Sequence, residues 1–141
     1  MPTPELRHVA TMTARLGGDS FAIKAPLGRR LIVEVEEVTI EGDRLKAHMV
    51  GKSAADWLTV ADDFSWGSLD VRFTLETDDG ALVYVEYGGR ADLAAGKVIS
   101  APVFHCGDER YDWLNRTQFV AVGSTDRETN LLTYELYEIG V

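Results

Sequence analysis

Several features common in other classes of protein are missing from this chain of 141 residues. It has a single cysteine, Cys106, so no intrachain disulfide can form, which agrees with a reducing compartment. No apolar run approaches the length that spans a bilayer, and the first residues lack the basic start and apolar stretch of a signal peptide. These absences predict a cytoplasmic protein without a membrane partner.

Positive charge is also scarce. The chain has 14 Lys and Arg against 23 Asp and Glu, a net charge of −9, and no segment rich in Lys and Arg. Such a chain repels a phosphate backbone, so we expect no nucleic-acid partner.

Cofactor motifs are missing as well. The sequence has no Gly-rich phosphate loop, no GxSxG elbow and no dinucleotide fingerprint. His8, His48 and His105 lie on separate segments without the spacing of metal ligands. His105 and Cys106 are sequence neighbours, which point to opposite faces of a strand and so form no nucleophilic pair. We therefore predict neither a cofactor nor a metal.

What the chain has is the composition of an ordinary globular domain. Hydrophobic residues make up 45% of it and charged residues 26%. The length suits one domain, residues 1–141, which can bury most of its apolar surface without disulfides or metals.

Apolar and polar residues alternate along most of the chain with a period of two, which predicts β-strands. A change of apolar parity near Glu36-Glu37 predicts a β-bulge. Only residues 92–96 look helical, as one turn with Asp92 as N-cap. Roughly eight strands of this kind fit either a sandwich or a closed antiparallel barrel. The predicted strands span residues 6–16, 30–40, 44–50, 58–61, 69–76, 81–87, 113–123 and 131–139, and Gly17-Gly18-Asp19 is expected to end the first.

The segment from Leu69 to Tyr87 predicts a β-hairpin that is the main candidate for function. A two-residue turn at Asp79-Gly80 would place Arg72 opposite Tyr87 and Thr74 opposite Val85. One face then gathers Asp70, Arg72 and Tyr87 among small apolar residues. That face is too apolar for a free surface and too charged for a dry core, which fits equally a ligand-holding lumen and a subunit interface.

These polar residues suggest acid–base chemistry, and each also has a structural interpretation. Asp70 would be a general base and Arg72 would stabilise negative charge, but the two also suit a self-neutralising ion pair. Tyr87 would donate to an oxyanion, or would lie as an amphipathic ring at a barrel mouth. Asp56 is the second candidate acid, because the neighbouring Trp57 would exclude water and raise its pKa; the alternative is a core Trp beside a turn-capping Asp.

Further side chains are candidates for binding a substrate. Trp57 and Trp113 would form apolar walls, and Asn115 would orient a polar group, although both tryptophans also suit a core and Asn115 a turn. Thr74 shares a strand face with Arg72, and His48 lies on the polar face of the predicted 44–50 strand. The predicted substrate-binding set is thus Trp57, Trp113, Asn115, Thr74 and His48.

A set of short motifs runs through most of the chain in a fixed order. In this order the chain resembles the DUF3237 family, also called UPF0311, of uncharacterised bacterial and fungal proteins. The resemblance implies an all-β fold, an antiparallel barrel of roughly eight to ten strands with minimal helix, lipocalin-like or allene-oxide-cyclase-like, and often a homo-oligomer. It implies no agreed activity. The motifs are Gly28-Arg29-Arg30, Glu41-Gly42-Asp43-Arg44-Leu45, Ala55-Asp56-Trp57, the Asp-x-Arg and Thr-x-Asp-Gly elements within 69–80, Pro102-x-Phe104, and residues 110–116.

Three hypotheses about function follow. The first is a cofactor-independent isomerase, cyclase or lyase that acts on a small aromatic or polyketide-like molecule inside the barrel. The second is a barrel that binds such a molecule without changing it, since carriage needs only shape and a few hydrogen bonds. The third is a structural oligomer without a ligand, in which the polar hairpin face is a subunit contact.

Overall fold

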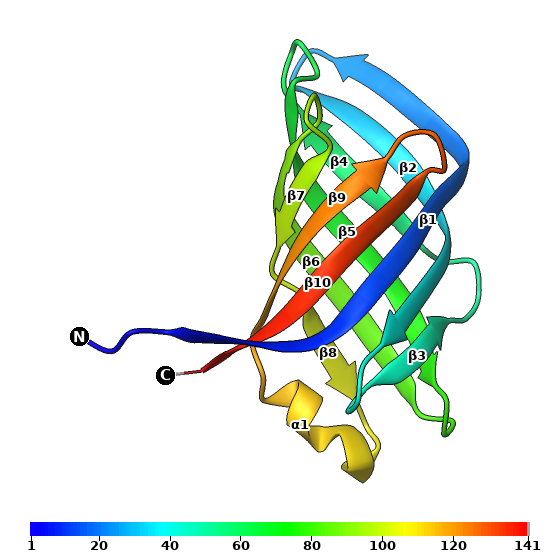
Figure 1. Ribbon diagram of the computed structural model, residues 1–141. Helices are drawn as coiled ribbons and strands as arrows, with labels where there is room; N and C mark the ends of the chain where they lie inside the picture. The colour runs from blue at the N-terminus through cyan, green and yellow to red at the C-terminus, as the bar shows by residue number, and fades with distance from the viewer. Residues whose placement is uncertain (141) are drawn as a thin grey trace.

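Ten strands account for most of the structure, a computed structural model that describes residues 1–140 (Figure 1). Helix is limited to one 3-10 turn and one four-residue segment near the end of β8. The strands are β1 (Glu5–Ala25), β2 (Gly28–Glu41), β3 (Lys46–Met49), β4 (Ala55–Val60), β5 (Trp66–Thr77), β6 (Leu82–Asp92), β7 (Lys97–Ser100), β8 (Val103–Cys106), β9 (Phe119–Asp126) and β10 (Leu131–Gly140); the helices are η1 (Glu109–Tyr111) and α1 (Asp112–Asn115).

The strands form one antiparallel sheet that closes into a ring. Its order runs β5-β4-β2-β1-β10-β9-β7-β6, and β6 pairs again with β5. Between β2 and β5 the ring is completed by two short strands, and between β9 and β6 by β7 alone. β3 and β4 pair with different lengths of β2 and β5, while β7 and β8 pair with opposite ends of β6. The all-β barrel predicted from the sequence is confirmed.

Helix α1 covers the end of the barrel where β8 lies (Figure 1). Leu114 is buried there among the core residues. The Asn115 side-chain oxygen accepts from the Cys106 N–H at 2.9 Å, and its NH2 donates to the Cys106 carbonyl at 2.8 Å. The amide thus completes the backbone hydrogen bonds of Cys106 as a neighbouring strand would.

The hairpin between β5 and β6 has a different register from the predicted one. Its turn is three residues long, Asp78-Asp79-Gly80, and the Thr77 N–H donates to the Ala81 carbonyl at 2.8 Å. Gly80 has a φ of +92°, which an L side chain rarely adopts. The predicted two-residue turn is therefore wrong. In the observed register Tyr87 lies opposite Val71, Arg72 opposite Glu86, and Thr74 opposite Tyr84.

This change of one residue decides which side chains enter the barrel. Val71 and Tyr87 point inward and are buried, whereas Asp70 and Arg72 are exposed on the outer face. The prediction that Asp70, Arg72 and Tyr87 share one face is wrong, and so is a lumen lined by Asp70 and Arg72. The inward set of the hairpin is Leu69, Val71, Phe73, Leu75, Val83, Val85 and Tyr87.

Strand β1 is longer than predicted. It passes through residues 17–19 as an irregularity in its pairing with β2 and continues to Ala25. The predicted end of this strand at Gly17-Gly18-Asp19 is wrong, because the two glycines form a bulge rather than a turn. The predicted bulge in β2 is present: Arg15 pairs with Glu37 and Leu16 with Val35, so Glu36 is the extra residue.

The helical residues also differ from the prediction. Residues 93–96 form a hairpin turn rather than a helix, although the Asp92 carboxylate accepts from the Ala95 N–H as a cap would. The strand predicted from Trp113 begins only at Phe119, because residues 109–115 are helical. Asp108 begins this helical segment by accepting from the Arg110 N–H.

Candidate functional site

Four polar side chains lie inside the apolar barrel and form what we call the interior cluster: Asp56, Tyr87, Ser100 and Tyr134. They come from β4, β6, β7 and β10, and each is buried, with Asp56 8% exposed and Tyr87 6%. Buried polar groups normally have hydrogen-bond partners. Within residues 1–140, however, the Ser100 and Tyr134 hydroxyls have none.

Asp56 lies at an inward position of β4, next to an interruption in the β4–β5 ladder. Asp56 pairs with Val71 and Thr59 with Ser68, and the two residue pairs between them are skipped. In this gap the Asp70 N–H donates to Asp56 Oδ1 at 3.0 Å. The carboxylate thus accepts a hydrogen bond that a backbone carbonyl of β4 would accept in a continuous ladder. This bond fixes one carboxylate oxygen to the backbone of β5.

The environment of Asp56 makes its carboxyl group weakly acidic. Burial raises its pKa from the ordinary 3.8 to about 6, the Asp70 N–H opposes this, and the negative charge of Asp70 adds to it. A carboxyl group with this pKa exchanges protons near neutral pH, as a general acid or base must.

The two tyrosines pack against each other inside the barrel. Their ring centroids are 5.9 Å apart with the rings nearly perpendicular. Burial raises both pKa values above the ordinary 10. For Tyr87 the neighbouring Tyr134 and Asp56 add to the effect, whereas for Tyr134 the nearby Tyr87 and Ser100 hydroxyls oppose it. Both phenols therefore stay protonated and can donate hydrogen bonds.

Gly123 makes room for the Tyr134 ring. The two residues lie opposite each other in the β9–β10 ladder. A Cβ atom at position 123 would lie 2.5 Å from Tyr134 Cδ1, which is too close for any side chain. The missing side chain of Gly123 thus fixes where this ring lies.

A cavity of about 90 Å3 adjoins the interior cluster. Its polar lining includes Asp56, Tyr87 and Tyr134, and most of the rest is apolar. The lining extends to Leu93 in the β6–β7 turn and to Thr125 near the end of β9, so the cavity approaches the end of the barrel opposite α1. This space suits a few waters or the polar end of a small molecule.

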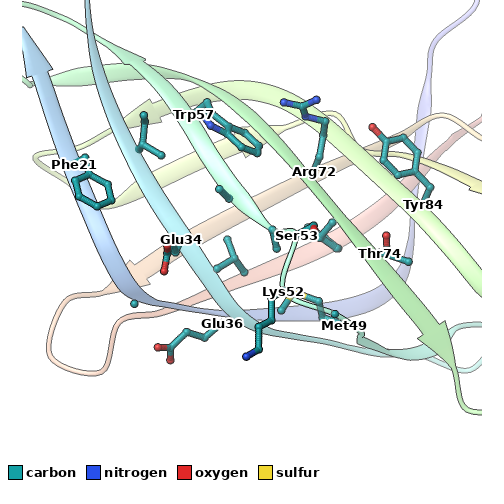
Figure 2. A pocket seen from close by; sticks show the side chains of 17 residues that line it. Phe21, Glu34, Glu36, Met49, Lys52, Ser53, Trp57, Arg72, Thr74 and Tyr84 are labelled. Atoms are coloured by element: carbon teal, nitrogen blue, oxygen red, sulfur yellow. The ribbon is translucent and has the colours of Figure 1, made fainter.

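A second, larger hollow lies on the outer wall of the barrel, and we call it the outer groove (Figure 2). It has a volume of about 1000 Å3 and is lined by residues from β1 to β6 and from the loop that joins β3 to β4. Three of the predicted site residues lie here: Trp57, Arg72 and Thr74. The Arg72 guanidinium lies over the Trp57 ring, 4.6 Å from its centroid.

The remaining predicted residues do not join either site. His48 is exposed on β3, opposite Thr39 and Glu76. Trp113 packs on α1 against Phe119 and under the Arg44 guanidinium, and Asn115 binds the backbone of Cys106. The structure brings together only Asp56 and Tyr87 from the predicted catalytic set.

The sequence analysis missed Tyr134 and Ser100. A signal for both was present, because each falls at an inward position of an alternating strand, Tyr134 between Leu132 and Leu136 and Ser100 two residues after Val98. A polar residue at such a position calls for a partner.

Neither metal ligation nor a helical membrane span is found in the described part of the chain. Across residues 1–140, no three or more His, Cys, Asp or Glu side chains are grouped so as to hold a metal ion. No helix in that range is long and apolar enough to cross a membrane.

The fold and this interior define a class of protein, a closed antiparallel β-barrel with polar groups inside it. The sequence model of a family described as a protein of unknown function, DUF3237, matches residues 4–139. The chain therefore belongs to the DUF3237 family, which confirms the resemblance seen in its motifs.

Individual relatives agree over the full length. The UPF0311 protein RPA1785 of Rhodopseudomonas palustris is 27% identical over 154 aligned positions, with 98% of each chain covered. A crystal structure of RPA1785, described as a conserved protein of unknown function, superposes with a TM-score of 0.85 and covers 99% of this chain and 100% of that one.

Two further solved structures share the fold. A β-barrel-like protein from Acinetobacter baumannii has a TM-score of 0.81 at 28% identity, covering 99% of this chain and 98% of its own. A structure described as an enzyme from Penicillium herquei has a TM-score of 0.71 at 22% identity, with the same coverage. The fold is thus common to proteins from bacteria and a fungus.

Proposed function

We propose that the protein is a cofactor-independent isomerase, cyclase or lyase that acts on a small aromatic or polyketide-like molecule. The carbonyl end of that molecule would enter the barrel interior. One observation carries the proposal: a buried carboxyl group with a pKa of about 6 shares a small cavity with a buried, unpartnered phenol. The similarity of the barrel to a fungal protein described as an enzyme supports a catalytic role on this fold.

The roles follow from the chemistry of the groups. Ionised Asp56 takes a proton from the carbon next to the substrate carbonyl, and the electron pair moves to the carbonyl oxygen. The Tyr134 and Tyr87 hydroxyls donate to that oxygen, which stabilises the enolate. Protonated Asp56 returns the proton at another carbon in an isomerase, or the enolate expels a leaving group in a lyase or attacks a second centre in a cyclase.

A non-catalytic binding barrel is the second candidate. The mainly apolar lining of the cavity favours it, because such a surface holds a small molecule without any proton transfer. The two functions differ in one measurable property, since only the enzyme moves a proton between the ligand and water.

A simple ketone tests the proposal without knowledge of the substrate. The probe is 2-indanone in D2O, and NMR measures exchange of the protons next to its carbonyl. We expect the native protein to accelerate this exchange and Asp56→Asn to lower the rate about 100-fold or more. Asp70→Asn is the matched control, because it keeps the backbone N–H that binds Asp56 and removes only the smallest of the three influences on the pKa of Asp56.

Each outcome separates the candidates. Binding of 2-indanone without accelerated proton exchange would identify a carrier and refute the catalytic proposal. An equal loss of exchange rate in Asp56→Asn and Asp70→Asn would show that the interior carboxylate has no special role. Retained activity in both variants would lead to the same conclusion.

A further inference from the structure

The barrel carries two stacked pairs of arginine and tryptophan, and they differ in one respect. Arg44 lies 3.9 Å from the centroid of Trp113, and its guanidinium also forms an ion pair with Glu138 at 3.3 Å. Arg72 lies over Trp57 but makes no ion pair and no side-chain hydrogen bond within residues 1–140. The first pair is neutralised by a direct ion pair. Arg72 forms none within the described part of the chain, although Glu86 lies opposite it on β6 and Asp70 lies on the same face of β5.

The surroundings of Arg72 are aromatic. Phe21, 53% exposed, and Tyr84, 39% exposed, line the same outer groove as Trp57. Figure 2 shows Trp57 and Arg72 side by side along one edge of the groove, with Phe21 and Tyr84 on either side of them. Exposed aromatic side chains gathered around a cation are characteristic of a binding surface.

The volume of the groove is suited to a small molecule. About 1000 Å3 is at the upper end of the range for small-molecule sites, which are mostly apolar with a few polar groups that fix orientation. Here the polar group beside the aromatic wall is Arg72.

We propose that the outer groove binds a planar aromatic carboxylate. Its ring would stack along Trp57 and Phe21, and its carboxylate would accept hydrogen bonds from Arg72. A guanidinium that stacks by its face on an indole still has its in-plane N–H donors free, and these match a carboxylate with two parallel hydrogen bonds.

The opposite side of the groove limits the ligand to one anionic end. Glu34 and Glu36 lie away from Arg72 in Figure 2, and Lys52 lies beside Glu36. The Glu34 carboxylate accepts from the Asp19 N–H at 3.0 Å, so its position is fixed by β1. A second anionic group would be repelled at Glu34, whereas a hydroxyl or amine of the ligand would find an acceptor there.

This site is independent of the interior cluster. None of the four residues of the interior cluster lines the outer groove, although the apolar Val35 belongs to the lining of both hollows. A ligand in the outer groove therefore touches none of the groups that carry the proposed catalysis.

The test is calorimetric titration of the full chain with 2-naphthoate and, separately, with the uncharged 2-naphthamide. We expect 2-naphthoate to bind at least about tenfold more tightly than the amide, because only the acid forms charge-assisted hydrogen bonds. Arg72→Gln should reduce the affinity for 2-naphthoate to that for the amide, and Arg72→Lys should give an intermediate value. Trp57→Leu should weaken both ligands.

Arg44→Gln is the matched control, since it removes the arginine of the neutralised pair and should change neither affinity by more than about twofold. Asp56→Asn should also leave 2-naphthoate binding unchanged. Equal affinity for the two probes, no binding of 2-naphthoate at millimolar concentration, or a loss in Asp56→Asn would each overturn the proposal. So would a loss of subunits in Arg72→Gln or Trp57→Leu by sedimentation, which would make the groove a subunit contact.

Discussion

The inner and outer faces of the barrel wall hold opposite kinds of polar chemistry, although both are built from the same strands. Inside, Asp56 and the tyrosines are buried, and their raised pKa values favour neutral forms. Outside, Arg72 is charged and exposed on a broad aromatic groove. The buried interior groups are suited to proton transfer, whereas the exposed arginine is suited to selecting a ligand by its charge and shape. Each experiment below changes one face and tests whether the other responds.

The largest expected effect is on the pH dependence of stability in Asp56→Asn. The folded protein raises the pKa of Asp56 from 3.8 to about 6, so folding favours the protonated form. This contribution to stability is fully present below pH 3.8 and is lost as the pH rises through about 6. Above that pH the ionised Asp56 lowers the free energy of unfolding by about 3 kcal/mol, and the uncharged amide of Asp56→Asn avoids this loss.

Urea unfolding at several pH values measures this difference. Asp56→Asn should match the native protein near pH 3.8 and exceed its free energy of unfolding by about 3 kcal/mol above pH 7. The Asp70→Asn control, on the outer face, should show no comparable trend. A pH-independent difference for Asp56→Asn would mean that burial does not govern this carboxyl group.

The second-largest effect on stability is expected at the β5–β6 turn, whose length decides which residues of the hairpin point inward. Gly80→Ala places a Cβ atom at a φ of +92° and should lower the free energy of unfolding by about 1–2 kcal/mol. Gly107→Ala is a control, because a Cβ atom there meets nothing within 4 Å and its φ is not in the left-handed region. Equal stability of the two variants would show that this turn conformation does not constrain the hairpin.

Removing the unpartnered phenol should have a smaller effect of the opposite sign. Tyr134→Phe eliminates a buried hydroxyl without a hydrogen-bond partner and should raise the free energy of unfolding by about 1 kcal/mol. Thermal unfolding measures this, and the same variant should slow exchange of 2-indanone. A loss of stability instead would indicate that the hydroxyl has a partner, such as a bound water.

The smallest effect is expected on the outer face. Arg72→Gln should change the free energy of unfolding by less than about 0.5 kcal/mol, because Arg72 is exposed and has no ion pair. Chemical unfolding at neutral pH measures this. A cost above 1 kcal/mol would mean that Arg72 is a structural residue, which would weaken the contrast between the faces.

The sequence predicted the barrel and most of its strands because alternation with a period of two is a strong local signal. The bulge at Glu36 was also predicted, since it reverses the parity of the apolar residues. The register of the β5–β6 hairpin was not, because Asp79-Gly80 suits both a two-residue turn and the end of a three-residue one. That single ambiguity reversed which residues of β6 share a face with Arg72.

The site was predicted only in part, for a related reason. Asp56 was identified with a raised pKa, but Trp57 was expected to cause it, whereas Trp57 lies on the outer face and burial in the barrel is the cause. Tyr87 and Tyr134 meet only because β6 and β10 lie on the same ring, and no local pattern predicts such a contact. The homo-oligomer and the cytoplasmic location stay predictions.

The amide of Asn115 protects an open edge of the sheet. Within residues 1–140, β8 pairs only with β6, so its other side presents unpaired backbone groups of the kind that recruit strands from other molecules. Asn115 occupies that edge at Cys106. Slow deamidation would replace its NH2 with a carboxylate oxygen facing the Cys106 carbonyl, and the resulting repulsion would open the edge. The backbone hydrogen bonding at the outer edge of β8 therefore depends on the chemical integrity of one side chain.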